Sequence, residues 1–240
     1  MKKHIFLAGD STVQSFKAEE MPYFTGWGQV LIEVLGTGTL SEVVYPEKDF
    51  PQAAVYENDD VVIHNYAMAG RSSKTFLEEG RFAPMLSKMQ KGDFLFLQFG
   101  HNDANKEKPE RYLTPEDYQK KLMEMISPAR EKGVKCALVS PIAMRDFNEE
   151  GRCKISFPEY RQAMKELAER EKLHFLDLGK ATAELCTGLG AEECKKLFLW
   201  VEDREDNAHL QRRGALEFAT LLARLIYREI PELGEIVRGK

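Results

Sequence analysis

Residues 93–99 (DFLFLQF) constrain the fold of this chain more than any other stretch. They form a nearly unbroken apolar run, and successive side chains of a strand point to opposite faces of its sheet. A strand here would bury both faces, which is typical of the middle of a parallel sheet covered by helices. The chain must then provide a helical layer on each side of that sheet.

Four shorter apolar runs favour further strands, and segments with helical signals separate them. The runs are residues 5–8, 61–67, 136–139 and 175–178, and we expect helices to begin near Gly26, Ser72, Thr114, Pro158 and Gly214. Strands that alternate with helices predict a doubly wound parallel sheet of about five strands inside a three-layer α/β/α sandwich. Residues 37–60 have no clear period, so we expect a long loop there.

The composition is that of a globular chain, with 43% hydrophobic and 30% charged residues among 240. No linker or repeat divides it, so we expect one domain over residues 1–240. With 34 basic and 39 acidic side chains, the net charge of -5 provides no basic surface for nucleic acid. No apolar run approaches the roughly 18 residues that a membrane span needs. We expect neither nucleic acid nor a membrane as a partner, and the sequence leaves the oligomeric state open.

The N-terminal segment and the cysteines indicate a cytoplasmic protein with free thiols. The basic residues 1–4 precede a run of about four apolar residues, which is too short for a signal peptide. Cys136, Cys153, Cys186 and Cys194 lack the paired spacing of a zinc or redox site. We expect Cys136 in the core and Cys153 at an exposed position. The histidines show no metal-binding motif either, so we expect no metal and no cofactor.

Residues that could carry chemistry follow the ends of three predicted strands. Ser11 follows the first strand, Gly70 the second and Asn102 the third. Because ligands in such sheets bind at the carboxyl ends of the strands, these residues should meet at one edge. Each also has a structural interpretation. Ser11 could cap a helix, Gly70 could form a plain turn, and Asn102 could bond its own loop.

Asp206 and His209 supply an acid-base pair near the C-terminus. Three residues apart on a loop or single turn, the carboxylate can accept a hydrogen bond from the imidazole. Asp203 is a nearby competitor, but its spacing to His209 fits no such motif. A serine, a histidine base and an orienting carboxylate together favour ester hydrolysis through an acyl-enzyme.

These stretches resemble the blocks of the SGNH (GDSL-like) hydrolase superfamily, which are centred on Ser, Gly, Asn and His in that chain order. The matching stretches are GDS at 9–11, NYAMAGRSS at 65–73, GHND at 100–103 and DNAH at 206–209. The resemblance covers most of the chain and implies a flavodoxin-like SGNH hydrolase fold. It implies a catalytic triad and an oxyanion hole. The triad would be Ser11, Asp206 and His209, and the oxyanion donors Ser11, Gly70 and Asn102.

Within the superfamily, the chain looks like the rhamnogalacturonan acetylesterase branch, through GWGQ at 26–29, the long second block and GHND. This implies a serine esterase that removes O-acetyl groups from pectin-derived plant oligosaccharides. The chain departs from the branch in two places. DNAHL at 206–210 stands where Thr and Phe are usual around the histidine, and we expect no leader although several relatives are secreted. The second departure suggests an intracellular enzyme that acts on imported oligosaccharides.

Trp27 and Arg71 are candidate substrate-binding residues in this interpretation. Trp27 could stack on a sugar ring, although a tryptophan between glycines at a helix start more often packs in the core. Arg71 could anchor a substrate carboxylate, although an arginine beside a turn usually belongs to a surface ion pair. Residues 71–74 (RSSK) lack the glycine spacing of a phosphate-binding loop.

Two other functions remain open. A lipid or acyl-thioester hydrolase on the same fold would need a long apolar groove, whereas residues 37–60 and 143–157 are polar. A non-catalytic carbohydrate-binding relative would keep the motifs without turnover, yet a site that has lost activity usually loses a member of the triad. We therefore expect a hydrolase of acetylated oligosaccharides, with activity that falls below roughly pH 6–7 because its histidine base must be uncharged.

Overall fold

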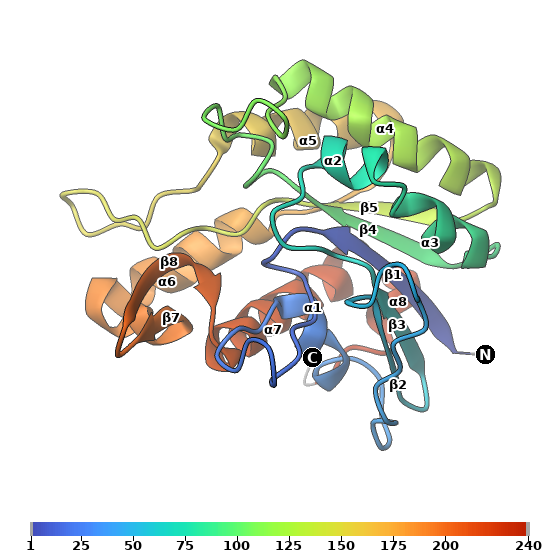
Figure 1. The fold of residues 1–240 in the computed structure, drawn as a ribbon, viewed down its shortest axis with the longest axis horizontal. Coiled ribbons are helices and arrows are strands. Elements are labelled where there is room, and N and C mark those ends of the chain that lie inside the picture. Colours follow the sequence, from blue (N-terminus) through green and yellow to red (C-terminus); the bar gives the residue numbers. More distant parts are fainter. Residues whose placement is uncertain (1, 239–240) are drawn as a thin grey trace.

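The computed structural model describes residues 2–238 and contains a six-stranded main sheet (Figure 1). In spatial order its strands are β2 (Ala54–Glu57), β3 (Val61–Asn65), β1 (Lys3–Gly9), β4 (Phe94–Gln98), β5 (Lys135–Val139) and β6 (His174–Leu176). The edge strand β2 is antiparallel to β3, and all other neighbours are parallel. The parallel strands have the flavodoxin-like order, with the first strand at the switch point.

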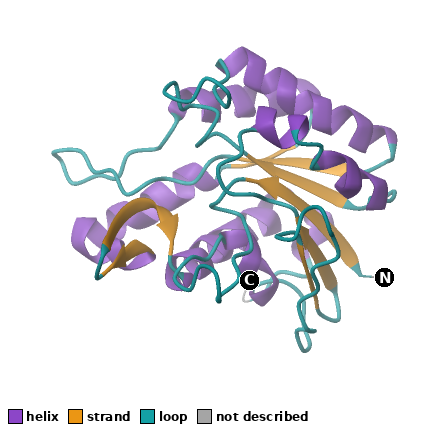
Figure 2. Ribbon diagram, in the orientation of Figure 1, coloured by secondary structure: helices purple, strands orange, loops and turns teal. Residues whose placement is uncertain are grey.

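Helices cover both faces of this sheet (Figure 2). On one side lie α2 (Ser73–Glu78), α3 (Phe82–Lys88), α4 (Pro115–Glu131) and α5 (Pro158–Glu171). On the other lie α1 (Trp27–Val30), α6 (Leu178–Cys194), α7 (Arg212–Glu229) and α8 (Pro231–Gly234), with short 3-10 turns at Leu31–Glu33 and Lys195–Leu197. The predicted three-layer α/β/α sandwich is confirmed.

Strand β4 has the central position that its sequence predicts. Phe94 and Phe96 pack into the core beneath α1 and α7, and Leu95 and Leu97 pack into the core beneath α2 to α5. All four side chains are at most 1% exposed. Burial of each stabilises the fold by roughly 1.5–3 kcal/mol, so β4 ties the two helical layers to one sheet.

Two local predictions are wrong. The loop expected over residues 37–60 contains β2, whose Ala54 and Tyr56 are buried. A strand of four residues is too short to stand out within a stretch that contains prolines. The helix expected over residues 26–36 is interrupted, because α1 and the turn that follows it end at Glu33. This segment holds three β-branched residues, which lower helix propensity.

A separate two-stranded sheet carries the C-terminal polar motif. Its antiparallel strands are β7 (Phe198–Val201) and β8 (Arg204–Leu210). Phe198 pairs with Leu210 and Trp200 pairs with Glu205, so β7 advances two residues where β8 advances five. Strand β8 is therefore bulged over residues 206–209. The expectation of a loop or single turn at these residues is wrong, because pairing with β7 makes a strand of a polar sequence.

The cysteines are free thiols, and all four are buried. The predicted core position of Cys136 is confirmed. The expectation that Cys153 is exposed is wrong, since it is 7% exposed and its backbone N–H donates to the Thr187 hydroxyl at 2.9 Å. Among the helices of residues 2–238, none is long and apolar enough to cross a membrane.

Candidate active site

Ser11 lies in a tight turn directly after β1. The carboxylate of Asp10 accepts hydrogen bonds from the Thr12 backbone N–H at 2.9 Å and from the Thr12 hydroxyl at 2.8 Å. A Cβ on Gly9 would lie 2.7 Å from the Gln98 carbonyl oxygen, so only glycine fits where this turn packs on β4. These contacts fix the Ser11 side chain at the carboxyl edge of the sheet.

His209 and Asp206 reach Ser11 from the other end of the chain. Nε2 of His209 lies 2.9 Å from Oγ of Ser11, and Nδ1 of His209 lies 2.7 Å from Oδ2 of Asp206. Both distances are those of good hydrogen bonds. With the Nδ1 proton held by Asp206, Nε2 carries the lone pair that can accept the Ser11 hydroxyl proton.

The bulge in β8 directs this acid-base pair. Oδ1 of Asp206 accepts from two backbone N–H groups of the bulge at 2.8 and 2.9 Å, while Oδ2 holds the imidazole of His209. Asn207 follows Asp206 in the bulge, and its side-chain oxygen accepts hydrogen bonds from Trp200 Nε1 at 3.0 Å and from Arg145 Nη1 at 3.3 Å. Arg145 belongs to the loop between β5 and α5, so that loop braces the bulge from outside the hairpin.

Hydrogen bonds stabilise the ionised form of Asp206 beside His209. Partial burial acts to raise the pKa of Asp206, but hydrogen bonds from the His209 imidazole and from two backbone N–H groups outweigh this effect. The pKa of Asp206 is therefore held well below its ordinary value. Phe24 packs edge-on against the His209 ring, with the ring centroids 5.3 Å apart. The carboxylate thus stays ionised beside a ring whose orientation is fixed.

Three potential oxyanion donors border the same cleft. Within residues 2–238, the backbone N–H groups of Ser11 and Gly70 donate to no protein acceptor. Gly70 has a φ of +75°, in the left-handed region that favours glycine. One N–H of the Asn102 amide donates to the Arg71 carbonyl at 3.1 Å, which leaves the second N–H for a ligand.

Two buried aspartates fasten the turns that carry these donors. Asp103 accepts from the backbone N–H groups of Ser73 at 2.9 Å and Gly100 at 3.0 Å, which joins the loops after β3 and β4. Burial raises the pKa of Asp103 to about 7. Burial acts in the same direction on Asp10, but His101, whose Nδ1 lies 3.2 Å from Asp10 Oδ2, brings the pKa of Asp10 below its ordinary value.

The predicted triad and donor residues meet at a cleft of about 470 Å³ at the carboxyl edge of the sheet. Arg111, Met144 and Phe157 line the same cleft and were not predicted. No local signal distinguishes them, because Arg111 lies in a loop of mixed charge and the other two bracket a polar stretch without a motif. Their position depends on how those loops fold back over the sheet.

The two expected substrate-binding residues lie away from the cleft. Trp27 is 1% exposed and its Nε1 donates to Gln98 at 2.8 Å, so it packs in the core and offers no surface to a sugar. The guanidinium of Arg71 is bound to the Glu79 carboxylate at 3.0 Å and to the Ala69 carbonyl at 2.9 Å. Arg71 thus forms the surface ion pair that was its alternative interpretation.

The arrangement is suited to nucleophilic attack on a carbonyl group. It combines a serine hydroxyl, a hydrogen-bonded imidazole, an ionised carboxylate and N–H donors beside one cleft. Among residues 2–238, no group of three or more His, Cys, Asp or Glu side chains has a geometry that could hold a metal ion.

Comparison with known proteins places the sequence among esterases. The GDSL-like lipase/acylhydrolase family model matches residues 7–215. The chain is 38% identical to the probable rhamnogalacturonan acetylesterase YesY of Bacillus subtilis (strain 168), over 98% of this chain and 95% of that protein. It is 35% identical to the rhamnogalacturonan acetylesterase RhgT of the same organism, over 98% of this chain and 93% of that protein.

Solved structures share the fold of this chain. The protein YxiM of Bacillus subtilis superposes with a TM-score of 0.77 at 25% identity, over 95% of this chain and 57% of that chain. The acetylxylan esterase Axe2 of Geobacillus stearothermophilus shares the fold, with a TM-score of 0.62 at 19% identity, over 99% of this chain and 97% of that chain. From the family match and the two relatives above 30% identity, the chain belongs to the GDSL-like lipase/acylhydrolase family of carboxylic ester hydrolases.

Proposed function

We propose that this chain is a serine esterase that removes O-acetyl groups from pectin-derived oligosaccharides through an acyl-enzyme, with residues 1–240 acting as one domain. The hydrogen-bonded relay carries this proposal, with 2.9 Å between His209 Nε2 and Ser11 Oγ and 2.7 Å between His209 Nδ1 and Asp206. The two relatives named as rhamnogalacturonan acetylesterases support the substrate class, since they match nearly the whole chain.

The proposed reaction has two halves. First, Ser11 Oγ attacks the acetyl carbonyl carbon while His209 Nε2 takes its proton, and the imidazolium then donates that proton to the departing sugar oxygen as the ester bond breaks. The N–H donors of Ser11, Gly70 and Asn102 would stabilise the negative charge on the carbonyl oxygen. In the second half, His209 takes a proton from a water that attacks the acetyl carbonyl carbon. The imidazolium then returns this proton to Ser11 Oγ as the bond between Oγ and the acetyl group breaks, which releases acetate.

The cleft suits a short acyl group on a polar carrier. Asn105 and Arg111 border it beside Asn102 and can bind hydroxyl or carboxylate groups of a sugar. A long acyl chain would need an extended apolar wall, whereas the largest apolar side chains of this cleft are Met144 and Phe157.

The first test is acetate release from acetylated pectic oligosaccharides, measured beside hydrolysis of a long-chain nitrophenyl ester. We expect acetate release by the wild-type protein, little long-chain activity, and no release by the Ser11→Ala variant. Preference for the long-chain ester would favour the lipid hydrolase alternative. Absence of Ser11-dependent release from either substrate would overturn the proposal.

Replacement of Asn102 by alanine tests the oxyanion hole. Loss of one such donor lowers kcat by about 10²–10³-fold. We expect this loss in steady-state rates, with a melting temperature close to that of the wild type. Asn102 is partly exposed, and its replacement removes one bond to the Arg71 carbonyl and one weak bond of 3.4 Å from Arg111. A variant of near-normal kcat would remove Asn102 from the oxyanion hole.

The pH profile tests the histidine base. The low pKa of Asp206 keeps its carboxylate ionised in mild acid. The stability that Asp206 contributes is present above its unfolded-state pKa and is lost only as the pH falls through its lower folded-state pKa. Protonation of Asp206 therefore does not account for a loss of activity in mild acid. We expect kcat/KM to fall in mild acid, because a protonated imidazole cannot accept the Ser11 proton. A profile that is flat down to pH 5 would contradict the role of His209.

A further inference from the structure

The cleft beside Ser11 contains an unexplained positive charge. Among the described residues that line it, Arg111 is the one with a permanently charged side chain, and no Asp or Glu lines the cleft. The proposed acetyl transfer does not use this guanidinium. Among these lining residues no carboxylate neutralises the guanidinium, which is a setting in which an arginine can bind an anionic ligand.

Arg111 lies next to the candidate oxyanion donors. Its Nη1 is 3.4 Å from Oδ1 of Asn102, which is a long and weak hydrogen bond. A Cβ built on Gly70 would lie 3.4 Å from the same Nη1, so the guanidinium stands over Gly70. A group bound by Arg111 would therefore lie close to the carbonyl of an acetyl ester bound at Ser11. It could belong to the same sugar as the acetyl group or to the next sugar of the substrate.

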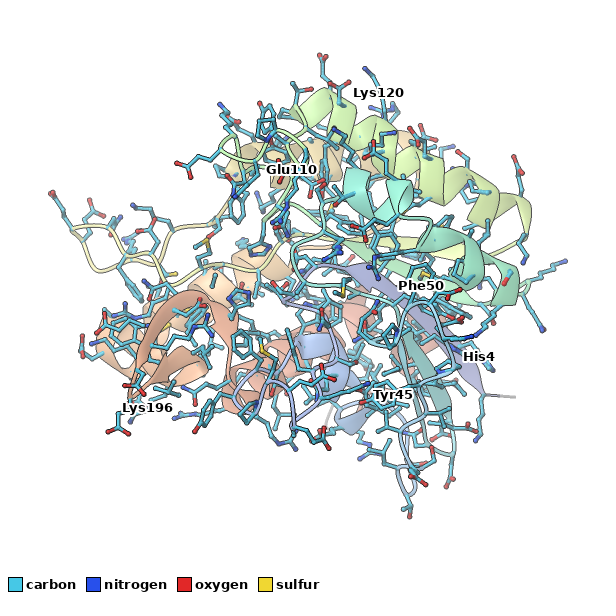
Figure 3. All side chains as sticks on the ribbon, in the orientation of Figure 1. His4, Tyr45, Phe50, Glu110, Lys120 and Lys196 are labelled. Carbon is cyan, nitrogen blue, oxygen red and sulfur yellow. The ribbon has the colours of Figure 1, made fainter. Side chains whose placement is uncertain are left out.

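The donors of Arg111 remain available to a ligand. Its Nε faces Glu110 at 3.5 Å, but Glu110 is 59% exposed, and such exposed pairs contribute little. Within residues 2–238, Nη2 of Arg111 has no hydrogen-bond partner. Figure 3 labels Glu110, which directly precedes Arg111 on the loop between β4 and α4. Arg71, by contrast, has its guanidinium occupied by Glu79.

We propose that Arg111 binds the carboxylate of a uronate in the substrate and so selects acidic over neutral acetylated oligosaccharides. The planar guanidinium fork matches a carboxylate with two parallel hydrogen bonds. The whole chain has a net charge of -5, so an acidic saccharide needs a local positive group to bind. This inference rests on the proposed esterase function and names its substrate class.

A different role for Arg111 gives different kinetics. If Arg111 only positioned Asn102, or stabilised the oxyanion itself, its loss would lower kcat for every ester, charged or neutral. If it binds a substrate carboxylate, its loss raises KM for acidic substrates and leaves neutral ones unaffected.

The test compares an acetylated oligogalacturonate with the same oligosaccharide after methyl esterification, which removes the charge and keeps the acetyl group. We expect the wild type to prefer the acid by roughly 10- to 100-fold in kcat/KM, the range for hydrogen bonds to a charged group. Arg111→Gln should bring this ratio within about threefold of one, mainly through KM, and Arg111→Lys should give an intermediate ratio because a lysine keeps the charge without the fork. Arg228→Ala removes a surface arginine of α7 and should leave the ratio unchanged.

Two further measurements separate this inference from the proposed function. Hydrolysis of nitrophenyl acetate, a small neutral ester, should be Ser11-dependent, and Arg111→Gln should lower its rate far less than it lowers kcat/KM for the oligogalacturonate. If that variant loses nitrophenyl acetate activity as strongly as oligosaccharide activity, Arg111 acts on the oxyanion side and the inference is wrong. If no acetate is released from either oligosaccharide, the proposed function fails. In that case, calorimetry with the Ser11→Ala protein still decides the inference, which is overturned if the oligogalacturonate binds no more tightly than its methyl ester.

Discussion

Replacement of Ser11 by alanine is expected to lower kcat for acetyl ester hydrolysis by about 10⁶-fold, the loss that follows removal of the nucleophile from a serine triad. Oγ of Ser11 lies 2.9 Å from Nε2 of His209. Within residues 2–238, no other hydroxyl group lies within hydrogen-bond distance of that nitrogen. A direct attack by water would use the oxyanion donors and the imidazole but would form no acyl-enzyme. Acetate release and nitrophenyl acetate hydrolysis measure the effect.

The serine variant should keep its fold, since its change removes a single partly exposed hydroxyl group. Its melting temperature should stay within a few degrees of the wild type. Ser87→Ala is the matched control, because Ser87 is a hydroxyl on α3 that donates only to the Pro84 carbonyl. Mass spectrometry adds a direct measurement: a serine-reactive phosphonate should label wild type once, at Ser11. Labelling at another serine, or substantial turnover by Ser11→Ala, would refute Ser11 as the nucleophile.

Replacement of Asp206 by asparagine is expected to lower kcat by about 10⁴-fold with little loss of stability. The amide can keep an oxygen facing the two backbone N–H groups of the bulge that Oδ1 now accepts. Its NH₂ group would then face Nδ1 of His209, which must become the acceptor. The imidazole proton moves to Nε2, and His209 can no longer accept the proton of Ser11.

Asp203→Asn is the matched control for this variant. Asp203 is exposed in the turn between β7 and β8, three residues from Asp206, and we expect near-normal turnover after its replacement. The Asp206→Ala variant should lose stability as well as activity, because the bulge then loses the acceptor of its two N–H groups. If the Asp203 variant is inactive and the Asp206→Asn variant is active, the carboxylate that orients the imidazole is Asp203 and not Asp206.

The position of Ser11, Gly70 and Asn102 could be predicted because each follows an apolar run that stops at a small polar turn. Strand ends are local signals, and parallel topology then brings the ends to one edge. Asp206 and His209 could be paired by their spacing, but their strand could not be predicted. The segment REDNAHL has no alternation of polarity, and its extended form depends on pairing with β7.

Arg111 shows what sequence patterns do not contain. It lies nine residues after Asn102 in a loop of lysines and glutamates, where nothing distinguishes it from its neighbours. Its place in the cleft comes from backbone bonds that fold the loop back, including Leu113 N–H to the Asp103 carbonyl at 3.0 Å and Arg111 N–H to the Lys108 carbonyl at 2.9 Å. Arg71 follows the second strand directly, which made it a candidate from the sequence, but Glu79, at the C-terminal end of α2, occupies its guanidinium.

The β7–β8 hairpin divides the proposed triad between two structural units. Ser11 is anchored to the six-stranded sheet, whereas Asp206 and His209 belong to a two-stranded sheet that pairs with no strand of it. Two strands alone are marginally stable, so the hairpin depends on its packing against α7 and on the Arg145 loop. Regions of this kind open locally at a lower free energy than the whole domain. If the hairpin opened while the main sheet stayed folded, the proposed base would separate from the proposed nucleophile, so we expect activity to be lost before the domain unfolds.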